Sequence, residues 1–230
     1  MINKIAPSLE EAVGFIQDSS TIMIGGFGTA GIPDQLLEVV VASDARDLTL
    51  IANNAGNGDD GIGTLLRLGR VRKMICSFPR QSDSFDFNAA YQEGRIELEL
   101  VPQGNLAERI RAAGSGIGAF YSPTGVGTLL TQDSEIREIN GKTYALQFPL
   151  FADLALIKAE TGDRWGNLTY RKAARNFGPV MATAARRTVA SVRNLVDLGD
   201  LDPEAIVTQG IFVNSLIQVD YSTTRPGGFK

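Results

Sequence analysis

The stretch from Thr21 to Pro33 constrains the fold of this chain more than any other. It reads Thr-Ile-Met-Ile-Gly-Gly-Phe-Gly-Thr-Ala-Gly-Ile-Pro. The apolar and β-branched residues at its start predict a buried strand, and the glycines that follow tolerate positive φ angles and a close ligand. Pro33 suits the first turn of a helix, and apolar residues recur after it at helical spacing. The stretch therefore predicts a strand, a glycine loop and a helix.

The glycine loop also predicts a ligand site. A loop of this kind aims backbone N–H groups and a helix N-terminus at whatever lies above the strand, which suits a phosphate or a carboxylate. Residues 26–31 match the dinucleotide pattern G-x-G-x-x-G, which requires an acidic residue at the end of the second strand. The predicted second strand, 48–52, ends instead in Asn53 and Asn54. A nicotinamide oxidoreductase and a turn of purely geometric purpose are kept as alternatives.

Predicted helices and strands alternate through the first half of the chain. Expected helices begin near Ser8 and Pro33 and cover 64–68, 85–93 and 106–113, and expected strands cover 21–24, 48–52, 71–77 and 96–101. Asn105 with Glu108 is a capping pattern for the last helix, whose Arg109 is expected on a solvated face. This alternation is typical of an open parallel sheet, which binds ligands at the carboxyl ends of its strands.

The alternation stops at residues 136–146, where two strand-like runs are joined by Asn140-Gly141, a sequence that favours a type I′ hairpin turn. A strand, a turn, a helix and a strand are expected after it, over 153–158, 161–163, 176–185 and 188–192. The tail 222–230 is expected to be loose. The prediction is one domain over residues 1–230, with an α/β fold whose open, mostly parallel sheet is flanked by helices and carries a β-hairpin excursion.

Composition excludes several classes of function. The chain has no histidine, which removes Ser-His-Asp and Cys-His nucleophile systems and the commonest transition-metal ligand. Its one cysteine, Cys76, rules out an internal disulfide and falls in a predicted buried strand. The net charge of −4 comes without a basic run, so neither nucleic acid nor a membrane is an expected partner. Because apolar runs are short and no signal-peptide core is present, a cytoplasmic location is expected.

The glycine stretch carries a resemblance to a known family. Gly-Gly-Phe-x-x-x-Gly-x-Pro after Asp18 and a hydrophobic strand resembles the signature of the α subunits of 3-oxoacid CoA-transferases, although Ser19 departs from the usual Gly or Asn. Further segments resemble the family in the same order, at 53–56, 102–111, 120–125, 166–171 and 174–177. The resemblance therefore reaches to about Val213. Segments 77–80 and 163–167 are similar to the branch that acts on 3-oxoadipate with succinyl-CoA.

The resemblance implies an enzyme whose nucleophile lies outside this chain. CoA transfer between carboxylic acids needs a carboxylate that becomes an acyl anhydride and then a CoA thioester. In the family this is a glutamate in a Ser-Glu-Asn-Gly segment of the β subunit, and no such segment occurs here; Glu160 before Thr161 and Gly162 is the nearest imitation. We expect no catalytic residue and no metal in this chain, and activity only with a β subunit, as an α2β2 hetero-oligomer.

The resemblance also implies which residues meet the substrates. The loop residues are expected to line the passage of CoA with their N–H groups available to polar atoms; they are Gly25, Gly26, Phe27, Gly28, Thr29, Ala30 and Gly31. Asn53, Asn54 and Gln103 are expected to face the acyl substrate, because neutral amide donors hold a carboxylate or keto oxygen without neutralising a nearby glutamate. Arg80, on a strand-end loop, either pairs with a substrate carboxylate or is a solvated loop charge.

The expected reaction moves CoA from succinyl-CoA to a 3-oxoacid, with 3-oxoadipate as the first choice. The α subunit of an acetoacetate or short-chain acyl CoA-transferase is the alternative within the family. A non-catalytic ligand-sensing protein on the same kind of α/β fold is the alternative of another class, since it would also have a glycine loop and no nucleophile.

Overall fold

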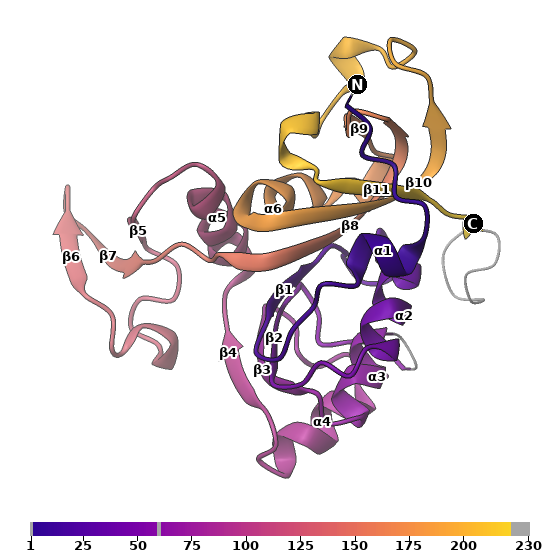
Figure 1. The fold of residues 1–230 in the computed structure, drawn as a ribbon. Coiled ribbons are helices and arrows are strands. Elements are labelled where there is room, and N and C mark those ends of the chain that lie inside the picture. The colour runs from indigo at the N-terminus through magenta and orange to yellow at the C-terminus, as the bar shows by residue number, and fades with distance from the viewer. Residues whose placement is uncertain (1, 59–60, 222–230) are drawn as a thin grey trace.

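The computed structural model describes residues 2–58 and 61–221 (Figure 1). The expectation of a loose tail at 222–230 therefore lies outside the described residues, as do Asp59 and Asp60 of the loop that follows the second strand. The chain forms one central sheet with helices on both faces and a smaller sheet that projects from it.

Seven strands follow one another in the central sheet in the order β11-β10-β8-β1-β2-β3-β4, and all seven are parallel. An eighth, β9 (Leu168–Thr169), pairs antiparallel with β8. The bounds are β1 Thr21–Ile24, β2 Leu48–Ile51, β3 Val71–Cys76, β4 Glu97–Leu100, β8 Ala152–Asp163, β10 Ala185–Val196 and β11 Ser215–Gln218. The predicted fold class is confirmed. The strand order reverses between β1 and β8, which makes their carboxyl ends the place where such sheets bind ligands.

Helices cover the two faces of the sheet unequally. One face carries α1 (Leu9–Val13), α2 (Asp34–Ala42), α3 (Gly61–Arg67) and α4 (Phe85–Gln92), and the other carries α5 (Gln103–Gly114) and α6 (Gly178–Ala184) (Figure 1). Alternate residues of β1 serve the two cores: Ile22 and Ile24 pack toward α1 to α4, whereas Met23 packs toward α5 and α6. Burial on both faces explains why the strands are continuously apolar.

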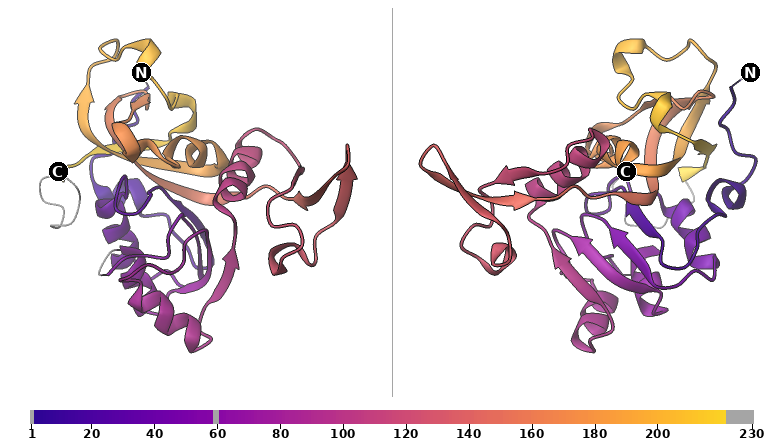
Figure 2. Two further views of the ribbon diagram at one scale, coloured as in Figure 1. Left: turned by 180° about the vertical axis from the view of Figure 1, so that it is seen from behind. Right: turned by 60° about the vertical axis from the view of Figure 1, so that its left-hand side comes forward.

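A three-stranded antiparallel sheet forms an arm that extends away from the body of the molecule (Figures 1 and 2). It consists of β5 (Phe120–Ser122), β6 (Ile136–Ile139) and β7 (Lys142–Gln147). Asn140 and Gly141 join β6 to β7 with φ angles of 51° and 73°. Two successive positive φ angles are what a type I′ turn requires, so the predicted hairpin is confirmed.

The turn predicted at 161–163 is wrong. Strand β8 continues through these residues to Asp163, paired with β10 along its length. A Cβ atom on Gly162 would lie 3.0 Å from the side chains of Leu168 and Leu216, so this glycine allows close packing rather than a turn. The chain turns instead at Gly166, where the buried Asp163 carboxylate accepts the N–H groups of Trp165 and Asn167 at 2.9 and 3.1 Å.

The start of α5 also differs from the prediction. The helix begins at Gln103 after Pro102, one turn earlier than expected, so Asn105 is not its cap. The Asn105 side chain is buried, and its oxygen accepts the Ser122 hydroxyl at 2.7 Å. The amide of Asn105 thus holds the base of the arm instead of a helix end. Moving the helix start places the side chain of Gln103 at the carboxyl end of the sheet.

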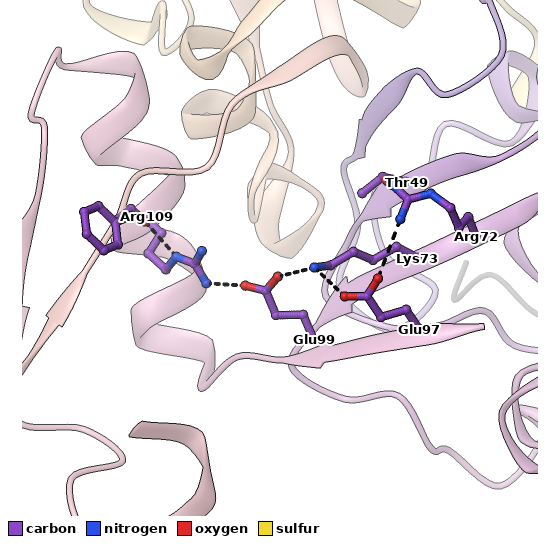
Figure 3. A network of polar contacts seen from close by, with 7 residues as sticks. Thr49, Arg72, Lys73, Glu97, Glu99 and Arg109 are labelled. Atoms are coloured by element: carbon purple, nitrogen blue, oxygen red, sulfur yellow. Dashed lines mark hydrogen bonds and ion pairs between the residues drawn. The ribbon is translucent and has the colours of Figure 1, made fainter. Parts of the chain in front are cut away.

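Arg109 does not lie on a solvated face. Its side chain is 15% exposed, and its guanidinium contacts Glu99 of β4 at 2.7 Å and the carbonyl oxygen of Phe148 at 2.7 Å (Figure 3). Glu99 also contacts Lys73 of β3 at 2.9 Å, and Lys73 contacts Glu97 at 2.9 Å. These contacts connect β3, β4, α5 and the base of the arm. Burial alone would raise the pKa of Glu99, but the hydrogen bonds from Lys73 and Arg109 outweigh it and lower that pKa.

We expect Glu99→Gln to destabilise the chain by about 1–2 kcal/mol near pH 7, because the charge-assisted bonds to Lys73 and Arg109 are lost at a partly exposed position. A lowered carboxyl pKa contributes stability above the unfolded value near 4.5 and loses it as the pH falls through the folded value. Urea unfolding of variant and wild type should therefore converge in acid. Glu108→Gln, at an exposed pair with Arg111, is the control. Equal effects of the two changes at pH 7 would contradict this account.

Candidate functional site

The glycine loop lies at the carboxyl end of β1, beside the point where the strand order reverses. Gly25 still follows the sheet, since its N–H donates to the carbonyl oxygen of Leu156 in β8 at 2.9 Å. Phe27 and Ala30 then close a tight turn by exchanging backbone hydrogen bonds of 3.0 and 3.1 Å. The φ angles of 140° at Gly26, 59° at Gly28 and 76° at Gly31 are the reason that this turn needs glycine.

Most N–H groups of this loop are engaged within the chain. Besides those of Gly25, Phe27 and Ala30, the N–H of Gly26 donates to the Asn176 side-chain oxygen at 3.0 Å, and that of Gly28 donates to the Asn54 side-chain oxygen at 3.0 Å. The expectation that these five groups are available to a ligand is wrong. The loop is a fixed wall beside the site, and a polar ligand group must be met by side chains instead.

Those side chains are three amides joined in one chain of hydrogen bonds. Asn53 and Asn54 follow β2, and Gln103 begins α5. Gln103 Nε2 donates to Asn53 Oδ1 at 2.6 Å, and Asn53 Nδ2 donates to Asn54 Oδ1 at 3.0 Å. Both asparagines are buried, with 2% and 7% exposure. The structure thus brings together the three residues expected to face the acyl substrate and links them to the glycine loop.

One backbone group determines the direction of this chain. The Gly28 N–H is a donor, so the Asn54 atom that it meets must be the oxygen. Asn53 must then present its nitrogen to Asn54 and its oxygen to Gln103. This orientation leaves the Asn54 nitrogen without an acceptor within the part of the chain that the structure describes. The loop therefore determines which amide atoms of the site are free to donate.

A small pocket opens between the glycine loop and these amides. It is lined by Gly25, Gly26, Gly28, Asn53, Asn54 and Asn57 together with apolar groups from Ile24, Ile32, Ala52, Gly56 and Ile62. A Cβ atom on Gly28 would have nothing within 4 Å, so the space above this residue is open. The pocket combines neutral donors with an apolar wall and holds no charged side chain among the described residues. Such a lining can hold a carbonyl or carboxylate oxygen beside a negatively charged group.

Arg80 is not part of this constellation. It lies on the loop after β3 and is exposed, and its guanidinium carbon is 5.8 Å from the centre of the Tyr91 ring on α4. Within the described residues it makes no hydrogen bond to the three amides. Its neighbour Phe78 does reach the site, since it forms a β-bridge with Asn54. Phe78 and Phe27 leave half-exposed phenyl rings beside the amides.

No side chain of the described residues is placed as a nucleophile in this site. Cys76 is fully buried in β3, as predicted, and burial raises the pKa of its thiol to about 12. Glu160 lies within β8 and contacts Arg193 at 3.4 Å. Within the same residues no group of three potential ligands could hold a metal ion. The helices described are also too short or too polar to cross a membrane.

Comparison with known proteins identifies the family. A family model described as Coenzyme A transferase matches residues 6–218. The chain is 64% identical to the α subunit of 3-oxoadipate CoA-transferase from Pseudomonas putida, covering 95% of both chains. It is 56% identical to the corresponding subunit from Acinetobacter baylyi, covering 95% of this chain and 96% of the relative. The chain belongs to the coenzyme A transferase family.

A solved structure extends the comparison to the fold. An acyl-CoA transferase from Escherichia coli, crystallised as a thioester complex with CoA, superposes with a TM-score of 0.86 at 22% identity. The match covers 98% of this chain and 51% of the Escherichia coli chain. The resemblance seen in the sequence is confirmed, and the nicotinamide oxidoreductase alternative is wrong. The CoA-transferase fold is thus present, with roughly half of that longer chain having no counterpart here.

Sequence reasoning missed one residue of the CoA-transferase site. Asn176 follows the short helix η2 (Lys172–Arg175), far from the loop in sequence, yet its side chain bonds to Gly26 and Ala30. The segment 174–177 resembles the family, but the resemblance alone predicts no role for it. A polar residue at the carboxyl end of a sheet was the available signal, but no spacing rule connects position 176 to position 26.

We expect Gly31→Ala to cost about 2–4 kcal/mol of folding stability, whereas Gly28→Ala costs about 1 kcal/mol. Both positions have positive φ angles, so both share the conformational cost. Only at Gly31 would the new Cβ also lie 2.5 Å from the carbonyl oxygen of Ala174 and 2.6 Å from Asn176 Nδ2. Thermal unfolding of the two variants measures the difference. Equal losses would mean that the segment around Asn176 does not pack on the loop as described.

Proposed function

We propose that this chain is the α subunit of a 3-oxoadipate CoA-transferase, which moves CoA from succinyl-CoA to 3-oxoadipate. The observation that carries the proposal is a ligand pocket lined by three linked amides and a glycine loop, with no carboxylate among its described lining residues. The names of the two relatives described above support the choice of substrate. Acetoacetate and short-chain acids are the alternative acceptors.

In this proposal the chain supplies half of a shared active site. The nucleophilic glutamate comes from the β subunit, since this chain has no Ser-Glu-Asn-Gly segment. The loop from Gly25 to Gly31 lines the approach of the CoA thioester, and Asn53, Asn54 and Gln103 face the acyl group. Neutral donors stabilise a developing oxyanion without forming an ion pair that would weaken the glutamate as a nucleophile.

The relatives are named as subunits, which supports a hetero-oligomer with a β subunit. We propose an α2β2 assembly in the cytoplasm, with small carboxylic acids and CoA esters as substrates. An expanse of apolar side chains on the arm is consistent with a larger assembly; Leu129, Ile136 and Phe148 are exposed there. Nucleic acid and membrane are not among the proposed partners.

The test is CoA transfer from succinyl-CoA, measured with this chain alone and with its co-expressed β subunit. We expect no activity alone, activity in the complex, and a higher kcat/KM with 3-oxoadipate than with acetoacetate. A preference for acetoacetate would overturn the choice of substrate. A stable complex with no transfer to either acid would favour the ligand-sensing alternative.

We propose that Arg80 selects dicarboxylic acceptors by pairing with the distal carboxylate. Its guanidinium is exposed and lies over the Tyr91 ring, so it can bind an anion at the edge of the site. Arg80→Ala should lower kcat/KM for 3-oxoadipate about 10–100-fold, the cost of a charge-assisted pair, and leave acetoacetate nearly unchanged. Arg95→Ala, at an exposed arginine paired with Glu93, is the control. Equal losses with both acceptors would exclude this role.

Gly28→Val should obstruct the passage of CoA. The space above Gly28 is open in this chain, so a branched side chain fits sterically but would occupy the path proposed for the thioester. The φ angle of 59° adds a conformational cost that a β-branched residue resists. The expected result is a complex that still assembles but turns over at least about tenfold more slowly. Unchanged turnover in an intact complex would remove Gly28 from the path.

A further inference from the structure

Asn176 uses the whole hydrogen-bonding capacity of its side chain on backbone groups around the glycine loop. Its oxygen accepts the N–H of Gly26 at 3.0 Å and the N–H of Phe177 at 2.7 Å. Its nitrogen donates to the carbonyl oxygens of Ala30 at 3.0 Å and Ala173 at 2.9 Å. Two backbone donors and two backbone acceptors determine the orientation of this amide, and no capacity is left for a ligand.

These four bonds join two segments that lie 150 positions apart in the sequence. Gly26 and Ala30 stand on either side of the loop tip at Gly28, so Asn176 holds both ends of the turn at once. Gly31 lets the segment come this close, because a Cβ atom there would lie 2.5 Å from the carbonyl oxygen of Ala174. The loop tip is therefore positioned from the side of β8, opposite the amides that follow β2.

We propose that Asn176 is a positioning residue for CoA transfer. It fixes the glycine loop so that the open space above Gly28 is presented to the CoA thioester and the Gly28 N–H meets Asn54. Because Asn176 acts through the loop, it does not itself touch a substrate. This inference rests on the proposed function for its kinetic consequence, but the ordering of the loop can be measured independently of activity.

The sharpest variant is Asn176→Asp, which keeps the size of the side chain and its acceptor oxygen. It replaces the donating nitrogen by an oxygen that faces the carbonyls of Ala30 and Ala173, so attraction becomes repulsion. In the complex with the β subunit, we expect the KM for succinyl-CoA to rise about tenfold, the effect of losing neutral hydrogen bonds. The KM for 3-oxoadipate should change less. Asn194→Ala, at an exposed position of β10, is the control.

Hydrogen exchange of the loop amides in the same complexes is the second readout. Residues 25–31 should exchange faster in Asn176→Asp and Asn176→Ala than in the wild type or the control. A merely structural role would lower the amount of assembled complex and leave both KM values and the exchange rates of that complex unchanged, which would overturn the proposal. If the wild-type complex transfers no CoA, the proposed function fails, whereas faster loop exchange in the variants still supports Asn176 as the residue that positions the loop.

Discussion

Two asparagine side chains hold the glycine loop from opposite sides of the position where the strand order reverses. Asn54, after β2, accepts the N–H of Gly28, and Asn176, reached from the side of β8, accepts the N–H of Gly26. A loop rich in glycine loses much conformational entropy when it becomes ordered, so such contacts are needed to hold one conformation. The site of this protein depends on that order, because the position of Gly28 determines the direction of the amide chain.

The charge of the site follows from the same arrangement. Donors come from neutral amides, and the charged groups of this region are kept elsewhere: Glu99, Lys73 and Arg109 neutralise one another at the far edge of the sheet (Figure 3). A pocket without a fixed charge can accept a carboxylate from a partner chain without neutralising it. In the proposed enzyme, this chain orients the substrate and the β subunit performs the covalent chemistry.

The periodic features of the fold were predictable from the sequence. Continuous apolar runs predicted the parallel strands, Asn140-Gly141 predicted the hairpin, and the glycine stretch after β1 located the loop. The resemblance identified Asn53, Asn54 and Gln103 as a group, and the structure places them in contact. Their assignment to the acyl substrate stays a prediction.

The rest depended on contacts between distant segments. The burial of Arg109 depends on Glu99 in an edge strand, and Gly162 reads as a turn unless Leu168 and Leu216 are known to pack against it. The N–H groups of the loop look available until Asn176 is placed beside them. No local propensity carries this information, because each case is decided by tertiary packing.

The most direct test of the central claim is a crystal structure of this chain with its β subunit, trapped as the CoA thioester of the partner's glutamate. The account predicts that the thioester passes above Gly28, with its acyl oxygen or the glutamate within hydrogen-bonding distance of the Asn54 nitrogen. A thioester that lies away from Gly28, with the three amides facing solvent or structural water alone, would contradict it.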